Sequence, residues 1–98
     1  MSYECHITLR AADATVGAEV ARFLNWKTSE IARDPLLGDD TFFYLTQHHP
    51  TVEPLMGSMQ RAVGDLVGEG VLPLRIKIEH IVFDTKTGVR LPTKPQEL

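Results

Sequence analysis

Alternation of apolar and polar side chains near both ends of the chain is the sequence feature that most constrains the fold. Residues 3–10 (YECHITLR) place an apolar side chain at every second position, and residues 72–84 do the same over a longer run. A period of two is typical of a β-strand with one buried and one exposed face. The chain is therefore expected to build a sheet from strands at both ends, with one face covered by the segments between them.

Two of those segments have the 3.6-residue period of amphipathic helices. The apolar positions are Val16, Val20, Phe23 and Leu24 in the first segment and Leu55, Met59, Ala62, Val63 and Leu66 in the second. Asp13 or Thr15 is expected to cap the first helix. Pro50 and Thr51 are expected to begin the second, which the glycines at 68 and 70 end.

A hairpin is expected between the two helices. Residues 26–31 (WKTSEI) and 41–48 (TFFYLTQH) have the β-branched and aromatic content of strands. They flank the segment ARDPLLGDD, in which Asp34-Pro35 and Gly38-Asp39 are turn-forming pairs. The last stretch, with a turn at Gly88 and two prolines, is expected to trail over the surface.

The resulting order βαββαβ predicts an α+β, ferredoxin-like two-layer sandwich: a four-stranded antiparallel sheet with two helices on one face. We expect the strands at 3–10 and 41–48 to lie centrally as a parallel pair, with the last strand beside the first. Residues 1–86 would form the single domain and residues 87–98 an extended C-terminal tail.

Composition limits the setting in which the protein works. The 98 residues are 43% hydrophobic and 23% charged, as in ordinary globular domains, and they contain neither a long apolar run nor an N-terminal signal-like segment. The single cysteine, Cys5, allows no intrachain disulfide. We therefore expect a cytoplasmic protein without a membrane partner. A net charge of −3 argues against binding to a nucleic-acid polymer.

The polar side of the strands is the most informative feature for function. If the apolar sides face the helices, one open sheet face collects His6, Thr8, Lys27, Ser29, Tyr44, Thr46, His48, Arg75, Lys77 and Glu79. Cations supply charge, hydroxyls bind phosphate oxygens and imidazoles transfer protons near neutral pH. This set predicts a site for a phosphorylated small molecule or nucleotide. The alternative is that these are the ordinary polar residues of a solvent-facing sheet.

The tetrapeptide His6-Ile7-Thr8-Leu9 resembles the His-x-Ser/Thr-hydrophobic motif of the 2H phosphoesterase superfamily. That resemblance implies cleavage of a phosphodiester without a metal, by two such motifs that face each other from the halves of a longer chain. The later candidate, His80-Ile81-Val82, has valine in place of the hydroxyl residue. The second motif would then come from a homodimer that supplies His6 and Thr8 twice, or from a substitute such as His48.

Catalytic roles follow from this hypothesis. His6 would be the general base or acid, with its tautomer set by Glu79, and Thr8 would donate to a phosphate oxygen. Arg75, Lys77 and Lys27 would stabilise charge on the phosphoryl oxygens, and His48 would protonate the leaving oxygen. We expect no cofactor and no metal. A metal bound by His6, His48, His49 and Glu79 is the alternative, but their spacing matches no common metal motif.

Other distinctive residues have structural interpretations. His80 is expected on the apolar face, His49 at the start of the second helix, and Cys5 and Trp26 in the core rather than at a site. RNA binding would need aromatics on the open face, where only Phe42 and Tyr44 are available.

A different class of function remains open. Small domains with one bare sheet face often associate, so we expect a homo-oligomer, most simply a dimer. The alternative to an enzyme is thus a non-catalytic oligomeric subunit, or a ligand-sensing or interaction module.

Overall fold

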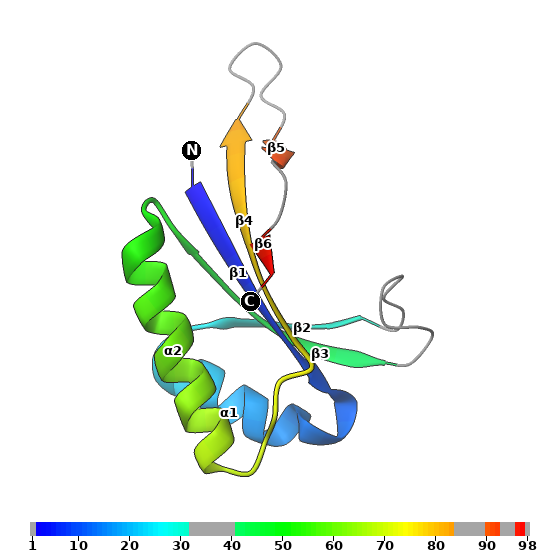
Figure 1. Ribbon diagram of the computed structural model, residues 1–98. Helices are drawn as coiled ribbons and strands as arrows, with labels where there is room; N and C mark the ends of the chain where they lie inside the picture. The colour runs from blue at the N-terminus through cyan, green and yellow to red at the C-terminus, as the bar shows by residue number, and fades with distance from the viewer. Residues whose placement is uncertain (1, 32–40, 84–89, 93–95, 98) are drawn as a thin grey trace.

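The computed structural model describes residues 2–31, 41–83, 90–92 and 96–97 (Figure 1). Its elements are β1 (Ser2–Arg10), the 3-10 turn η1 (Ala11–Asp13), α1 (Ala14–Leu24), β2 (Lys27–Ile31), β3 (Phe42–His49), α2 (Val52–Gly68), β4 (Arg75–Phe83), β5 (Arg90–Pro92) and β6 (Gln96–Glu97). The expected turns at Asp34-Pro35, Gly38-Asp39 and Gly88 lie outside the described residues. No helix within the described ranges has the length and apolar character needed to cross a membrane.

The fold is α+β, with an antiparallel open sheet and two helices, as the sequence predicts. The strand order is β2-β3-β1-β4-β5, and β6 also pairs with β4. The predicted parallel pairing of β1 with β3 is wrong, because every residue pair between them is antiparallel. The reason is topological: the crossover through α1 makes β2 parallel to β1, and β3, which forms a hairpin with β2, lies between the two.

The described residues of the C-terminal segment add the short strands β5 and β6 to the sheet. The sequence predicts a tail over the surface, but β5 and β6 both pair antiparallel with β4. Lys77 is in register with Glu97, and Val82 with Leu91. The backbone groups on the outer side of β4 therefore have hydrogen-bonding partners along part of its length.

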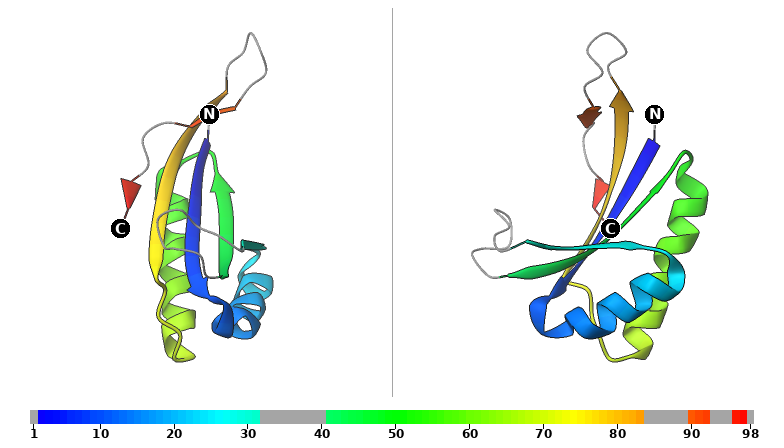
Figure 2. Two further views of the ribbon diagram at one scale, coloured as in Figure 1. Left: turned by 90° about the vertical axis from the view of Figure 1, so that its right-hand side faces the viewer. Right: turned by 180° about the vertical axis from the view of Figure 1, so that it is seen from behind.

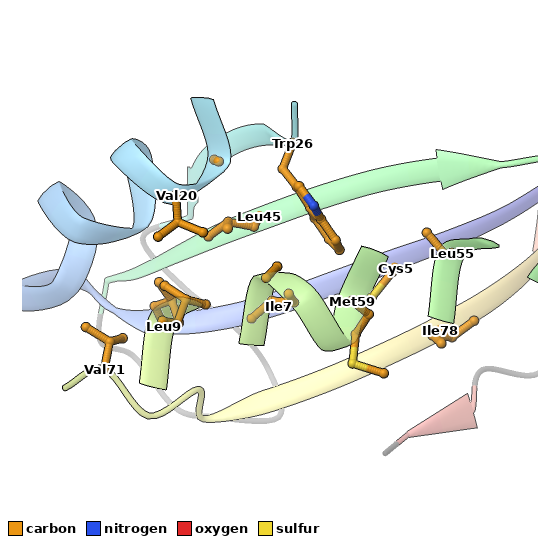
Figure 3. Packing of buried hydrophobic residues seen from close by; sticks show 13 residues of the cluster. Cys5, Ile7, Leu9, Val20, Trp26, Leu45, Leu55, Met59, Val71 and Ile78 are labelled. Carbon is orange, nitrogen blue, oxygen red and sulfur yellow. The ribbon is translucent and has the colours of Figure 1, made fainter. Parts of the chain in front are cut away.

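Both helices pack on the same face of the sheet, as the side view in Figure 2 shows. Between the layers lies one core, drawn in Figure 3, to which Cys5, Ile7, Leu9, Val20, Ala21, Trp26, Leu45, Leu55, Met59, Ala62, Leu66, Val71 and Ile78 contribute. The alternation in β1 places three of these residues on the helix side. That arrangement leaves the polar side of β1 on the other face of the sheet.

The buried face of α1 is narrower than its apolar stripe predicts. Val20 is buried, whereas Phe23 is 79% exposed and contributes nothing to the core. The helix ends at Leu24, since the next residue, Asn25, adopts a left-handed conformation (φ 63°) and donates its backbone N–H to the carbonyl of Ala21. The turn directs Trp26 inward, where it is 6% exposed and acts as the expected core residue.

The predicted start of the last strand is also corrected. β4 begins at Arg75 rather than at residue 72, and Leu72 is 66% exposed. The N–H of Leu74 donates to the carbonyl of Thr8 at 2.8 Å, immediately before β4 begins to pair with β1.

Candidate functional site on the open sheet face

The open face is the sheet face that carries no helix, and its side chains lie in three rows across the strands. The His6 row contains Lys27, Thr46, His6 and Lys77; the Thr8 row contains Ser29, Tyr44, Thr8 and Arg75; the Glu4 row contains His48, Glu4 and Glu79. All ten predicted residues lie in these rows. The register therefore brings them together on one face, as the period-two pattern predicts.

His6 occupies the centre of the His6 row and is held at both ring nitrogens. Its Nδ1 lies 2.9 Å from Oγ1 of Thr46 on β3. Its Nε2 lies 2.5 Å from Oε1 of Glu4, two residues earlier on the same face of β1. A neutral imidazole satisfies both contacts when Nε2–H donates to the carboxylate and the Thr46 hydroxyl donates to Nδ1.

Burial favours the neutral form of this ring. Desolvation, the largest effect, lowers the pKa of His6 from its ordinary value of 6.5, and the charge of Lys77 lowers it too; together they outweigh the carboxylates of Glu4 and Glu79, which raise the pKa. The side chain of His6 is only 25% exposed. Near neutral pH His6 is thus held as a base whose Nδ1 lone pair faces the Thr46 hydroxyl.

Glu4 is the residue of this site that the sequence analysis missed. Its Oε2 lies 2.5 Å from Nε2 of His48, so one carboxylate bridges two imidazoles. Glu4, His6 and Thr8 follow one another at every second position on the polar side of β1. This pattern alone was sufficient to place Glu4 on the open face. Its side chain is 12% exposed, which strengthens both contacts relative to those of a solvent-exposed carboxylate.

Glu79 does not have the role expected for it. The sequence hypothesis assigns it to fix the tautomer of His6, but its Oε1 lies 3.9 Å from Nε2 of His6 and 2.7 Å from Nζ of Lys77. Glu4 contacts the imidazole instead, because Glu79 is in register with Glu4 and only diagonal to His6. The charge of Lys77 is therefore partly balanced by Glu79.

The open face is not uniformly accessible. Thr8 is 2% exposed and Tyr44 is 7% exposed, so both residues are almost fully buried. By contrast, Lys27 and Ser29 on β2 are exposed. A ligand that approaches this face reaches the β2–β3 side before it reaches Thr8.

A hollow of about 440 Å³ lies beside β2 and β3, and Ser58 of α2 and the core residue Trp26 place part of it on the helix side. It is lined by Asn25, Trp26, Lys27, Thr46, Gln47, His48, His49 and Ser58. Its volume is within the range of small-molecule sites. Three of the predicted site residues, Lys27, Thr46 and His48, thus border a space that a ligand can occupy.

The remaining histidines lie elsewhere. His49 accepts a hydrogen bond at Nδ1 from the backbone N–H of Thr51 (3.2 Å), beside the start of α2 as expected. His80 stacks on Tyr3 with ring centroids 4.6 Å apart, on the helix side of the sheet. The alternative metal set is not brought together, since Nδ1 of His49 faces Thr51. Within the described part of the chain no group of three or more His, Cys, Asp or Glu residues has metal-binding geometry.

Comparison of the chain with protein-family models, with curated proteins and with solved structures found no match.

Proposed function

We propose that this protein binds a phosphorylated small molecule or nucleotide on the open sheet face and hydrolyses a phosphodiester there without a metal. The observation that carries this proposal is the imidazole of His6, held between the Thr46 hydroxyl and the Glu4 carboxylate in a row that also contains Lys27 and Lys77. Such an imidazole is suited to proton transfer near neutral pH.

The cations support a phosphate ester as the ligand class. Lys27 and Lys77 flank Thr46 and His6 in the His6 row, and Arg75 is the β4 residue of the Thr8 row. Strands are about 4.8 Å apart, so the two lysine backbones are roughly 14 Å apart across three strand spacings. This span accommodates a nucleotide-sized ligand between positive charges, which balance phosphoryl oxygens.

The resemblance to the 2H phosphoesterases supports the same chemistry. Its half-motif, His6-Ile7-Thr8-Leu9, lies on a central strand with His6 and Thr8 on the open face. We further propose that the sandwich is of the ferredoxin-like type and that it works in the cytoplasm as a homodimer. A dimer would bring a second His6 to the site, in the role that His48 would otherwise take.

A second candidate function is a non-catalytic oligomeric subunit or interaction module. One observation favours it: Phe23 is 79% exposed and borders a hollow of about 800 Å³ with Val16 and Val20. The hollow is also lined by the charged residues Glu19, Arg22, Asp65 and Glu69. An exposed aromatic with a polar rim is common at protein interfaces. In this function a second copy of the chain would cover α1, and no ligand would bind the open face.

A thermal-shift screen tests the proposed function. Nucleotides, cyclic nucleotides and cyclic dinucleotides are added to the wild type and to the His6→Ala and Lys77→Ala variants. A ligand at 100 times its Kd adds about 2.7 kcal/mol of stability. For a domain of this size the expected rise in Tm is roughly 10 °C or more. We expect at least one phosphorylated ligand to produce the shift in the wild type and a smaller shift in both variants.

The matched control is Arg61→Ala, which removes an exposed cation from α2, the layer on the other side of the sheet. It should keep the full ligand-induced shift. If no phosphorylated compound raises Tm, or if His6→Ala and Lys77→Ala keep the full shift, the proposed site is wrong. Light scattering in the same buffer distinguishes the candidates, since a Phe23-dependent dimer without any ligand response supports the interaction module.

A further inference from the structure

The hollow beside β2 and β3 constrains how His6 can act on a ligand. Among the described residues the hollow is lined by Thr46 but not by His6. Oγ1 of Thr46 lies 2.9 Å from Nδ1 of His6. The other ring nitrogen, Nε2, is occupied by Glu4. Thr46 therefore lies between the imidazole of His6 and the hollow.

Thr46, His6 and Glu4 form a hydroxyl–imidazole–carboxylate series. The imidazole can take the hydroxyl proton at Nδ1, and the carboxylate at Nε2 stabilises the imidazolium that results. Each contact is within hydrogen-bonding distance, at 2.9 Å and 2.5 Å. This is the arrangement by which proteins make a side-chain hydroxyl nucleophilic, with a base oriented by a third group.

Lys27 is placed to stabilise the attack of this hydroxyl on a phosphodiester. It is in register with Thr46 on the adjacent strand, is exposed, and lines the same hollow. A phosphodiester in the hollow would lie near this ammonium, which can balance the negative charge that grows on the phosphoryl oxygens. His48 borders the hollow as well.

We propose that Thr46 is the nucleophile of the site and forms a covalent phosphothreonine diester with the substrate. This inference rests on the proposed function and names its catalytic residue. In the first step Thr46 Oγ bonds to phosphorus, its proton moves to Nδ1 of His6, and the bond between phosphorus and the leaving oxygen breaks. The leaving oxygen takes a proton from solvent.

In the second step water restores the enzyme. The water oxygen bonds to phosphorus, the bond from phosphorus to Thr46 Oγ breaks, and Oγ takes back the proton from His6. The water keeps one proton on the phosphate monoester product and releases the other to solvent, which replaces the proton that the leaving oxygen took. No oxidant, metal or other reactant is needed.

The experiment uses bis(4-nitrophenyl) phosphate, whose leaving group departs as a coloured phenolate without protonation. Rapid mixing with the wild type should release about one equivalent of phenolate in a burst, because the covalent intermediate accumulates before water hydrolyses it. Intact mass spectrometry of the quenched sample should show one 4-nitrophenylphosphoryl group, and fragmentation should place it on Thr46.

Three variants separate a nucleophile from a residue that only orients His6. Thr46→Val removes the hydroxyl at almost constant volume and should lower turnover by about 10³-fold or more. Thr46→Ser keeps the hydroxyl and should restore both turnover and the adduct. Thr28→Val removes an exposed hydroxyl from the other face of β2 and should change neither.

Three outcomes overturn the proposal. If Thr46→Val turns over within about twofold of the wild type, or if the adduct is on another residue, Thr46 is not the nucleophile. If the wild type releases no phenolate, the covalent step is also rejected. In each case a ligand-induced Tm shift that depends on His6 and Lys77 leaves the proposed binding function intact, so the two failures are distinguishable.

Discussion

Nε2 of His6 lies 2.5 Å from Oε1 of Glu4, two positions earlier on the same strand. Residues i and i+2 of a strand point to the same face, so β1 alone places the carboxylate beside the imidazole. The neighbouring strands complete the site, since β3 supplies Thr46 and His48 to this pair.

Replacing the Glu4 carboxylate should lower the pKa of His6 further. The charge of Glu4 raises the pKa of His6 against a larger desolvation effect, so Glu4→Gln removes a raising contribution and leaves burial in place. Titration of the His6 ring by NMR should show a lower midpoint in Glu4→Gln than in the wild type. The control is Glu30→Gln, an exposed carboxylate on β2. A midpoint in Glu4→Gln at or above the wild-type value contradicts the electrostatic account.

Folding stability should decrease in weak acid because of His6. The folded pKa is lowered from 6.5, so below pH 6.5 the unfolded state binds the proton more readily and the free energy of unfolding falls as pH drops towards the folded pKa. Above pH 6.5 this contribution is absent. Urea unfolding at pH 7.5 and pH 5 should therefore show a larger loss in the wild type than in His6→Gln, which cannot titrate. Equal losses in the two proteins would argue against a desolvated His6.

The thiol of Cys5 should be unreactive in the folded protein. Cys5 is fully buried, and desolvation raises its pKa to about 12, so almost no thiolate is present at pH 8. Reaction with a disulfide reagent should be slow in buffer and fast in concentrated urea. The chain has one cysteine, so the signal reports this site alone. Native and unfolded protein that react at the same rate would show that β1 does not bury the thiol.

Two helix glycines should respond to alanine in opposite directions. A Cβ at Gly17 would lie 2.7 Å from Cδ1 of Leu9 and 3.0 Å from Cε1 of Phe43, whereas a Cβ at Gly57 would meet nothing within 4 Å. Gly57→Ala should stabilise by about 0.5–1 kcal/mol through backbone entropy. Gly17→Ala should destabilise by about 1–3 kcal/mol because Leu9 is fully buried and cannot move away.

Urea denaturation of both alanine variants, with the wild type as reference, measures these changes. An equal gain in the two variants would mean that α1 does not pack closely on β1 and β3. The comparison holds the substitution constant, so the difference between the variants reports the close approach at Gly17 rather than helix propensity.

Local sequence patterns were sufficient to predict much of the fold and to predict which side chains lie on the open face. The alternation in residues 3–10 places Cys5, Ile7 and Leu9 in the core and His6 on the opposite side, and this follows from strand geometry alone. The period of α2 likewise identifies Leu55, Met59 and Leu66 as buried. Covalent geometry sets these periods within each element, so no knowledge of distant contacts is needed.

Contacts between distant segments decided the rest. Phe23 continues the stripe of α1 but is exposed, because the stripe is wider than the surface on which the helix packs. The antiparallel pairing of β1 with β3 depends on the crossover through α1, which no strand encodes by itself. Tertiary packing also buries Thr8, although its position in the alternation predicts an accessible hydroxyl.

The sequence by itself determined which side chains share the open face, because side-chain direction in a strand is a local property. Only the tertiary structure decided which of them touch, because contact depends on register, and register is set by pairing between strands about 40 residues apart. It places Thr46 against His6, puts Glu4 rather than Glu79 on the imidazole, and opens the hollow at Lys27 and Thr46.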